Sequence, residues 1–82
     1  MNLFVANISN SVKEDALRAL FTEFGEVISV RIMTDKESGY SKGFGFVEMS
    51  NEGQALEAIR KLSNAPFFGK NLVVSKARPK TF

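Results

Sequence analysis

The residues best suited to chemistry are three phenylalanines, two of which lie between charged side chains. Phe4 is near the start of the chain, and Phe44 and Phe46 alternate with glycines between Lys42 and Glu48. Exposed aromatic rings can stack on nucleic-acid bases while neighbouring cations contact the phosphates. Aromatic residues in strands more often point into a core, so the interpretation depends on the elements that carry these rings.

Catalytic chemistry has little support in the composition. The chain has 82 residues and contains neither Cys nor His, which removes disulfides, thiolate metal sites, Cys nucleophiles and imidazole bases. The acids are scattered over predicted helix, loop and strand, with no base, nucleophile and orienting group placed together. Gly43 and Gly45 lack the third glycine and the helix of a phosphate-binding loop. We therefore expect no enzyme activity, no cofactor and no metal site.

The charge is distributed unevenly along the chain. Residues 70–82 carry a charge of +4 and no acid, whereas residues 1–69 carry −2, so the net charge is +2. A basic stretch on a near-neutral body indicates either a contact with an anionic polymer or a solvated tail, and charge alone leaves both open. The length predicts one small domain, over residues 1–78, followed by a short basic tail at 79–82.

The composition also bears on the compartment. No apolar run approaches the roughly 20 residues that span a bilayer, and the N-terminal segment lacks the basic and apolar regions of a secretion signal. The absence of cysteine fits a reducing compartment. We expect a cytoplasmic protein that acts as a monomer and does not contact membranes.

Apolar periodicity predicts six elements in the order βαββαβ. Strands are expected at 3–6, 27–33, 43–49 and 72–77. Two sets of apolar residues with i, i+3, i+4, i+7 spacing indicate helices, and they comprise Leu17, Leu20, Phe21 and Phe24, then Ala55, Ala58, Ile59 and Leu62.

The helix ends carry expected capping residues. Ser11 and Glu14 fit a capping box, Gly25 fits the C-cap of the first helix, and Asn51 fits the N-cap of the second. Both helices must bury their apolar stripes against the strands. The predicted fold class is α+β and ferredoxin-like, with two helices on one face of a four-stranded antiparallel sheet. The other face of the sheet is then open to water.

The third strand indicates which of its residues face the water. Side chains alternate faces with a period of two, so Phe44 and Phe46 share a face with Lys42 and Glu48. Pointing the rings inward would bury both charges against the helices, at several kcal/mol for each unpaired charge. We therefore predict that Phe44 and Phe46 lie on the open face.

The other strands fit the same arrangement. The residues expected to face the core are Leu3, Val5, Ile28, Val30, Ile32, Leu72 and Val74. The residues predicted to form a nucleic-acid-binding face, together with the basic C-terminal stretch, are Asn2, Phe4, Arg31, Met33, Lys42, Phe44, Phe46, Lys76, Arg78 and Lys80. The spacing of Phe44 and Phe46, about 6.6–7 Å along a strand, suits two bases splayed from one strand of nucleic acid. A duplex does not offer its base faces in this way, so a single strand is the expected partner.

Two of these segments resemble the paired motifs of the RNA-recognition motif family. Residues 42–49, Lys-Gly-Phe-Gly-Phe-Val-Glu-Met, resemble the RNP1 octamer, and residues 3–8, Leu-Phe-Val-Ala-Asn-Ile, resemble the RNP2 hexamer. The resemblance runs from about residue 2 to residue 77, and it is strongest to the small stand-alone bacterial RNA-binding proteins of this family. Three positions depart from the family pattern. Met49 replaces an aromatic residue, Lys13 replaces a residue suited to cap the first helix, and Ser63-Asn64 replaces the usual Asn-Gly after the second helix. Asn64 is expected to keep that turn because asparagine tolerates left-handed geometry.

The resemblance implies binding of single-stranded RNA and assigns roles to particular residues. Phe4 and Phe46 would stack on bases, Phe44 would pack on sugar or backbone, and Lys42 would contact a phosphate. Asn7 would shape the turn that ends the first strand. Single-stranded DNA is expected to bind more weakly. The alternative is a protein-interaction module that uses the same sheet face, whereas Phe67 and Phe68 are expected to pack beneath their loop.

Overall fold

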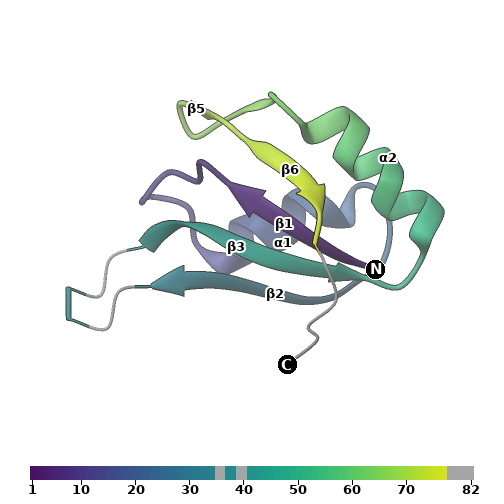
Figure 1. Cartoon of the computed structure of the whole chain (residues 1–82), viewed down its shortest axis with the longest axis horizontal. Coiled ribbons are helices and arrows are strands. Elements are labelled where there is room, and N and C mark those ends of the chain that lie inside the picture. The colour runs from purple at the N-terminus through teal and green to yellow at the C-terminus, as the bar shows by residue number, and fades with distance from the viewer. Residues whose placement is uncertain (35–36, 39–40, 78–82) are drawn as a thin grey trace.

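The computed structural model describes residues 1–34, 37–38 and 41–77, with the backbone alone at residues 41 and 42 (Figure 1). The main elements follow the predicted βαββαβ order, with a short hairpin inserted before the last strand. The bounds are β1 (Asn2–Ala6), α1 (Glu14–Thr22), β2 (Val27–Thr34), β3 (Ser41–Met49), α2 (Glu52–Leu62), β4 (Pro66–Phe67), β5 (Lys70–Asn71) and β6 (Val73–Lys76).

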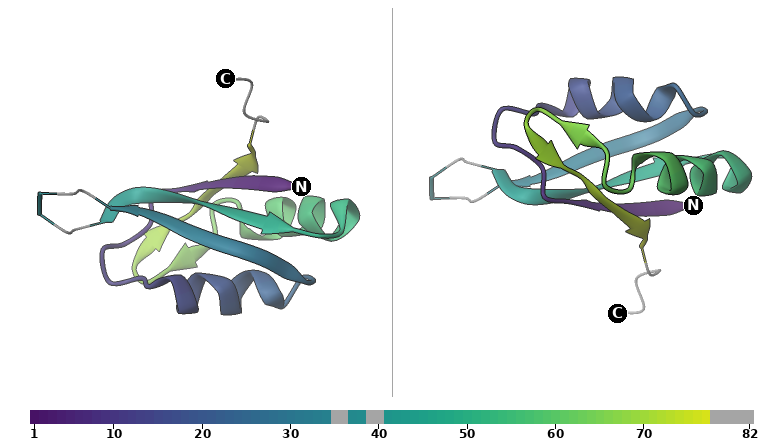
Figure 2. Two further views of the ribbon diagram at one scale, coloured as in Figure 1. Left: turned by 90° about the horizontal axis from the view of Figure 1, so that it is seen from below. Right: turned by 90° about the horizontal axis from the view of Figure 1, so that it is seen from above.

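Four of the strands form one antiparallel sheet in the order β2-β3-β1-β6. Both views in Figure 2 show α1 and α2 on the same side of this sheet, which leaves its opposite face uncovered by helices. The ferredoxin-like arrangement predicted from the sequence is confirmed. The two central strands, β1 and β3, are the strands that carry the phenylalanines Phe4, Phe44 and Phe46.

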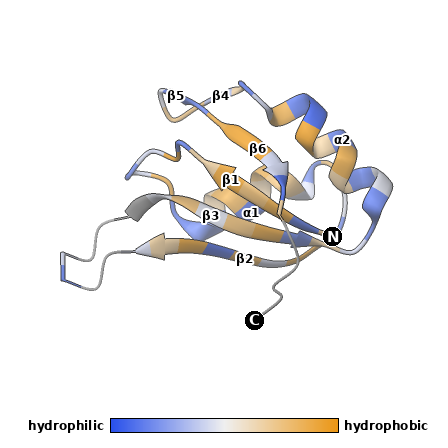
Figure 3. Cartoon of the chain, in the orientation of Figure 1, coloured by the Kyte–Doolittle hydropathy of each residue, from blue (hydrophilic) through white to orange (hydrophobic). Residues whose placement is uncertain are grey.

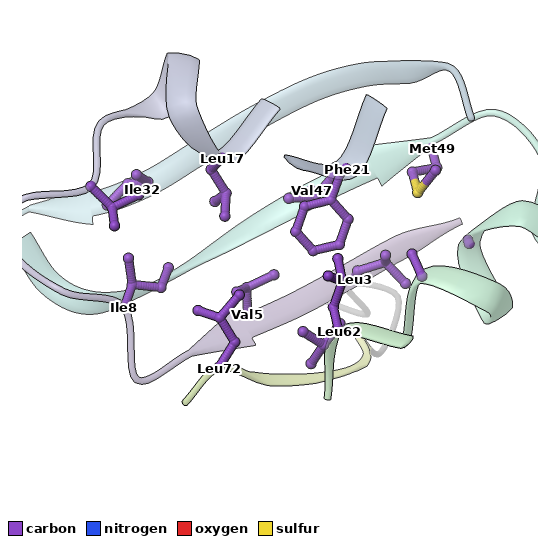
Figure 4. Packing of buried hydrophobic residues seen from close by; sticks show 14 residues of the cluster. Leu3, Val5, Ile8, Leu17, Phe21, Ile32, Val47, Met49, Leu62 and Leu72 are labelled. Carbon is purple, nitrogen blue, oxygen red and sulfur yellow. The ribbon is translucent and has the colours of Figure 1, made fainter. Parts of the chain in front are cut away.

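The hydrophobic core lies between the sheet and the helices. Figure 4 shows Leu17 and Phe21 of α1 pointing toward the strands that carry Leu3, Val5 and Val47, and these five side chains have no exposed surface. Figure 3 shows hydrophobic residues along the strands, with hydrophobic and hydrophilic residues alternating around α2. The remaining buried hydrophobic residues are Ile8, Val12, Ile32, Met49, Ala55, Ala58, Leu62, Leu72 and Val74. Leu20, Phe24 and Ile59 are only partly buried at the margin of this core.

The strand β2 departs from simple alternation. Val27 lies opposite Met49 and Ser29 lies opposite Glu48, so Ile28 is an extra residue in a bulge. Val27 packs against the core in its place, and Ile28 is 51% exposed. The prediction that Ile28 faces inward is wrong because a bulge shifts the parity of the strand by one residue. Beyond the bulge, Val30 and Ile32 pack inward as expected.

The two helices begin in different ways. Asn51 caps α2 as predicted, because its side chain accepts a hydrogen bond of 2.8 Å from the backbone N–H of Gln54. The capping box predicted for α1 is wrong. Lys13 occupies the N-cap position without a side-chain hydrogen bond, and a Glu14 carboxylate oxygen accepts from the backbone N–H of Ile32 at 3.0 Å. Glu14 therefore ties the helix to β2 instead of capping it.

The end of α1 also differs from expectation. The C-cap residue is Glu23 in right-handed helical geometry, so the prediction that Gly25 is the C-cap is wrong. Gly25 serves close packing instead, because a Cβ at this position would collide with the side chain of Gln54 on α2. Asn64, which follows α2, adopts the expected left-handed conformation with φ 68°.

The hairpin β4–β5 was not predicted. Its central residues Phe68 and Gly69 have φ values of 53° and 85°, the left-handed geometry of a type I′ turn. Phe67 packs against the core as predicted, and its ring centroid lies 4.8 Å from that of Phe68. The expectation that Phe68 is also covered is wrong, since it is 53% exposed. A tight turn places its first central side chain outward, away from the loop.

Burial predicts a contrast between two leucines in helices. Leu17→Ala should lower the free energy of unfolding by about 2–5 kcal/mol, because it leaves a cavity in a packed core. Leu56→Ala makes the same change where the side chain is 49% exposed, and should cost less than about 1 kcal/mol. Urea denaturation followed by circular dichroism measures both values. Equal losses in the two variants would contradict the observed orientation of the helices.

Candidate nucleic-acid interface

The open face of the sheet carries the three phenylalanines in neighbouring register positions. Phe4 of β1 lies directly opposite Phe46 of β3, and Ala6 lies opposite Phe44. Leu3 and Val5, which flank Phe4, and Val47, which follows Phe46, are fully buried on the helix side. Strict alternation in both central strands therefore places all three rings on the face that the helices leave open.

The rings contact one another and form one aromatic surface, here called the ring platform (Phe4, Phe44 and Phe46). The ring centroid of Phe4 lies 5.9 Å from that of Phe44 and 5.6 Å from that of Phe46, with interplanar angles of 38° and 57°. These tilted arrangements are favourable aromatic geometries, worth about 0.5–1.5 kcal/mol per pair. The platform is thus assembled before any ligand arrives.

The exposure of the rings is graded. Phe46 is 37% exposed, whereas Phe4 and Phe44 are half-buried by their neighbours. The prediction that the rings lie on the open face is confirmed, although their mutual packing covers more of Phe4 and Phe44 than free exposure to solvent would. Each ring keeps accessible surface on which a planar group can stack.

Glycine between the two β3 rings allows close approach of β2. A Cβ at Gly45 would collide with the carbonyl oxygen of Arg31 and lie 3.0 Å from the Cα of Ile32. These are backbone atoms and cannot turn aside as a side chain can. Gly45 therefore lets β2 and β3 pair closely below Phe44 and Phe46, and the pairing holds the two rings in place.

The end of β1 is held by two hydrogen bonds to backbone carbonyl oxygens. Asn7 adopts φ 58°, and its side-chain amide donates a hydrogen bond of 2.6 Å to the carbonyl oxygen of Asn71. The next residue, Ile8, donates its backbone N–H to the carbonyl oxygen of Gly43 at 2.9 Å, and Gly43 itself has φ 85°. The turn role expected of Asn7 is confirmed. Asparagine suits this position because it tolerates left-handed geometry and bonds locally.

Charged and polar residues border the ring platform. Arg31 lies opposite Phe46 on β2 and is exposed. Lys76, near the end of β6, is also exposed, but it lies opposite the buried Leu3, so alternation places it on the helix side of the sheet and not beside the platform. Neither forms an ion pair within the described residues. Met33 is half-buried. The predicted contacts Lys42, Arg78 and Lys80 have side chains outside the described part of the chain.

One end of the face carries a polar pair. Asn2 lies directly opposite Glu48. This pair is two residues along each central strand from the Phe4–Phe46 pair, so both pairs lie on the same face. The sequence predicted Asn2 as a site residue. It also placed Glu48 on this face but assigned it no role in binding.

Other kinds of site find no support in residues 1–34, 37–38 and 41–77. No group of three or more potential metal ligands gathers there. No helix in the described part of the chain is long and apolar enough to cross a membrane.

The chain is similar to known proteins over nearly its whole length. The model of the RNA recognition motif family matches residues 3–73. RbpA of Nostoc sp. is 44% identical over 80 residues, which cover 98% of this chain and 78% of the relative. RbpA of Synechocystis sp. is 41% identical over 80 residues, which cover 98% of this chain and 79% of the relative.

Solved structures agree with the sequence relatives. A structure described as RNA Binding Protein PG1 has a TM-score of 0.91 and 44% identity, and the match covers 98% of this chain and 99% of that one. A structure described as a Sxl-lethal protein/RNA complex has a TM-score of 0.90 and 37% identity, and the match covers 96% of this chain and 47% of that one.

The close strand pairing at Gly45 generates a test. Gly45→Ala should lower the free energy of unfolding by about 1–3 kcal/mol or more, because the added methyl forces β2 away from β3. Gly53→Ala is the matched control. At that site in α2 the nearest atom to a Cβ is a side-chain oxygen of Asn51 at 3.3 Å, and alanine has the better helix propensity. Chemical denaturation measures both, and a neutral Gly45→Ala would contradict the pairing.

Proposed function

Because this chain belongs to the RNA recognition motif family, we propose that it binds single-stranded RNA on the open face of its sheet. The single observation that carries the proposal is the ring platform, in which Phe46 is 37% exposed and contacts Phe4 at 5.6 Å between ring centroids. In this proposal Phe4 and Phe46 each stack on one base, and Phe44 packs against the sugars between them.

The chemistry of the face favours a single strand. Stacking needs the flat surface of a base, and a duplex hides those surfaces between its neighbours. Phe4 and Phe46 come from adjacent strands, so two consecutive bases can separate and each lie on its own ring. The match to a structure described as a complex with RNA supports RNA as the ligand.

Phosphate contacts are proposed for the cations around the platform. Arg31 is opposite Phe46 and free of ion pairs within the described residues, so its guanidinium is available to a phosphate. Lys76 lies opposite Leu3 on the edge strand β6, so in this proposal it reaches a phosphate only around the edge of the sheet. The proposal includes Lys42, Arg78 and Lys80 because of their charge alone. We also propose that the domain ends at residue 78 and that residues 79–82 form a short basic tail.

The remaining proposals concern the choice between RNA and DNA, the oligomeric state, the compartment and protein partners. Single-stranded DNA should bind more weakly than RNA, since stacking alone does not distinguish them but the 2′-hydroxyl adds contacts on RNA. We propose a monomer that acts in the cytoplasm. The family is one of binding modules, and the chain is not an enzyme. Use of the open face for a protein partner is disfavoured, because the ring platform and its flanking cations suit a nucleic acid better.

Loss of a platform ring should weaken RNA binding. Phe46→Ala should cost about 1–3 kcal/mol of affinity for a short single-stranded RNA, because one base loses its stacking partner. The matched control is Phe68→Ala, which removes a ring that is 53% exposed but lies on the β4–β5 hairpin. Fluorescence anisotropy with a labelled RNA octamer measures both affinities. Equal losses in the two variants would place binding elsewhere.

The salt dependence of binding should report the phosphate contacts. If three or four phosphates are contacted, the slope of log affinity against log salt concentration should be about −2 to −3, from ~0.7 per contact on a single strand. Arg31→Gln should make the slope less steep by roughly 0.7. Lys61→Gln, an exposed change in the last turn of α2, should leave it unaltered. A wild-type slope near zero would contradict phosphate binding.

A further inference from the structure

An open groove of about 450 Å³ adjoins the ring platform at one end of the sheet. It is lined by Met1, Asn2, Glu48, Ser50, Glu52, Lys76 and Ala77. Asn2 and Glu48 face each other in register and share the open face with Phe4 and Phe46. The groove therefore begins two residues along each central strand from a ring of the platform, a distance of about 6.6–7 Å.

The charges of this groove do not suit a phosphate. Its charged groups are the carboxylates of Glu48 and Glu52, the ammonium of Lys76 and the α-ammonium of Met1, which already donates a hydrogen bond of 2.7 Å to the carbonyl oxygen of Met49. The groove therefore has no excess of positive charge to attract a phosphate. An ionised carboxylate is only an acceptor, so it repels phosphate oxygens and forms hydrogen bonds with N–H donors. Beside a stacking platform, N–H donors come from the edges of bases. The groove thus complements the edge of a base whose flat surface lies on a platform ring.

Glu48 is free to make such a contact. Its side chain is half-buried and forms no hydrogen bond or ion pair within the described residues. The nearby acid Glu26 differs, because it already accepts a hydrogen bond of 2.9 Å from the Ser50 hydroxyl. A partly desolvated carboxylate without a partner gains more from a ligand donor than a fully hydrated one does.

The pair of Asn2 and Glu48 matches one base better than the others. The Watson–Crick edge of guanine presents two adjacent donors, N1–H and the N2 amine, followed by the O6 acceptor. Two carboxylate oxygens of Glu48 accept from the donors, and the amide of Asn2 donates to O6. Directly opposed residues have Cβ atoms about 4.5–5.5 Å apart, which suits contact with one edge. Uracil offers a single N–H between two carbonyls, and these oxygens face the carboxylate unfavourably.

We propose that Glu48 and Asn2 make the platform selective for guanine, with Glu48 as the principal specificity-determining residue. The proposal rests on the proposed RNA-binding function. In this proposal a base stacks on a platform ring and its edge contacts Glu48 and Asn2 in the groove. The rings then supply affinity for any base, and the polar pair supplies discrimination between bases. The contacts predict a dependence on the N2 amine, which distinguishes guanine from hypoxanthine, the analogue that has a hydrogen in place of this amine.

The test compares three labelled RNA octamers by fluorescence anisotropy. One contains uridine alone, one carries a single central guanosine, and one carries inosine at that position, which lacks the N2 amine. The wild-type chain should bind the guanosine octamer roughly tenfold more tightly than the uridine octamer, with the inosine octamer between them. Glu48→Gln should reduce the preference to about twofold or less, and Asn2→Ala should reduce it in part.

The control removes the same charge elsewhere. Glu23→Gln, at the exposed C-cap of α1, should keep the full preference for guanosine even if a less acidic chain binds all three octamers more tightly. Thermal unfolding of Glu48→Gln shows whether the variant is folded, and Glu48→Ala serves as a second variant if it is not. A guanosine preference that survives in a folded Glu48 variant, or equal binding of all three octamers by the wild type, would overturn the proposal. Failure of the wild type to bind any octamer would instead reject the RNA-binding function itself.

Discussion

Alternation of side chains in the paired central strands is the constraint on which the rest of this structure depends. Leu3 lies opposite Val47 on the helix side, and Phe4 lies opposite Phe46 on the open side. Burial of the first pair, which has no exposed surface, fixes the orientation of the second. Because the side-chain period is two, a slip of one residue would exchange core and surface along the whole strand. Core packing and the binding face are therefore set by the same register.

Local features reinforce this register. Gly45 permits close pairing of β2 with β3, and Asn7 ends β1 with a left-handed turn tied to Asn71. Glu14 joins the start of α1 to β2 through the backbone N–H of Ile32. The rings then pack against one another, so little side-chain freedom is left to lose when a base stacks on them. The sheet supplies a surface on which the proposed stacking, phosphate contacts and base-edge contacts involve different side chains.

Sequence patterns predicted the features that follow from strict periodicity or from one residue's intrinsic preference. The open-face position of Phe46, the capping by Asn51 and the left-handed turn at Asn64 belong to this class. Features that depend on long-range partners were not predictable. Glu14 fits a local capping box, but its carboxylate accepts a hydrogen bond from the backbone N–H of Ile32, eighteen positions away. Gly25 resembles a C-cap, yet its lack of a side chain serves contact with Gln54.

Two further errors came from insertions in otherwise regular patterns. The bulge at Ile28 reverses the parity of the start of β2, and an apolar side chain alone does not reveal such a bulge. The turn at Phe68 and Gly69 places a bulky residue at positive φ, where asparagine is usual, so its type I′ geometry carried no sequence signal. In the binding face, Glu48 was placed correctly, but its pairing with Asn2 across the strands required the register.

Amide chemical-shift mapping tests the central claim most directly. The chain labelled with ¹⁵N is titrated with a single-stranded RNA octamer and, separately, with the same sequence as a duplex. Binding to the ring platform predicts that the single strand shifts the amides of β1 and β3 around Phe4, Phe44 and Phe46, leaves those of α1 and α2 in place, and has a larger effect than the duplex. Shifts concentrated on α2 around Leu56, or on the β4–β5 hairpin around Phe68, with β1 and β3 unchanged, would contradict the account.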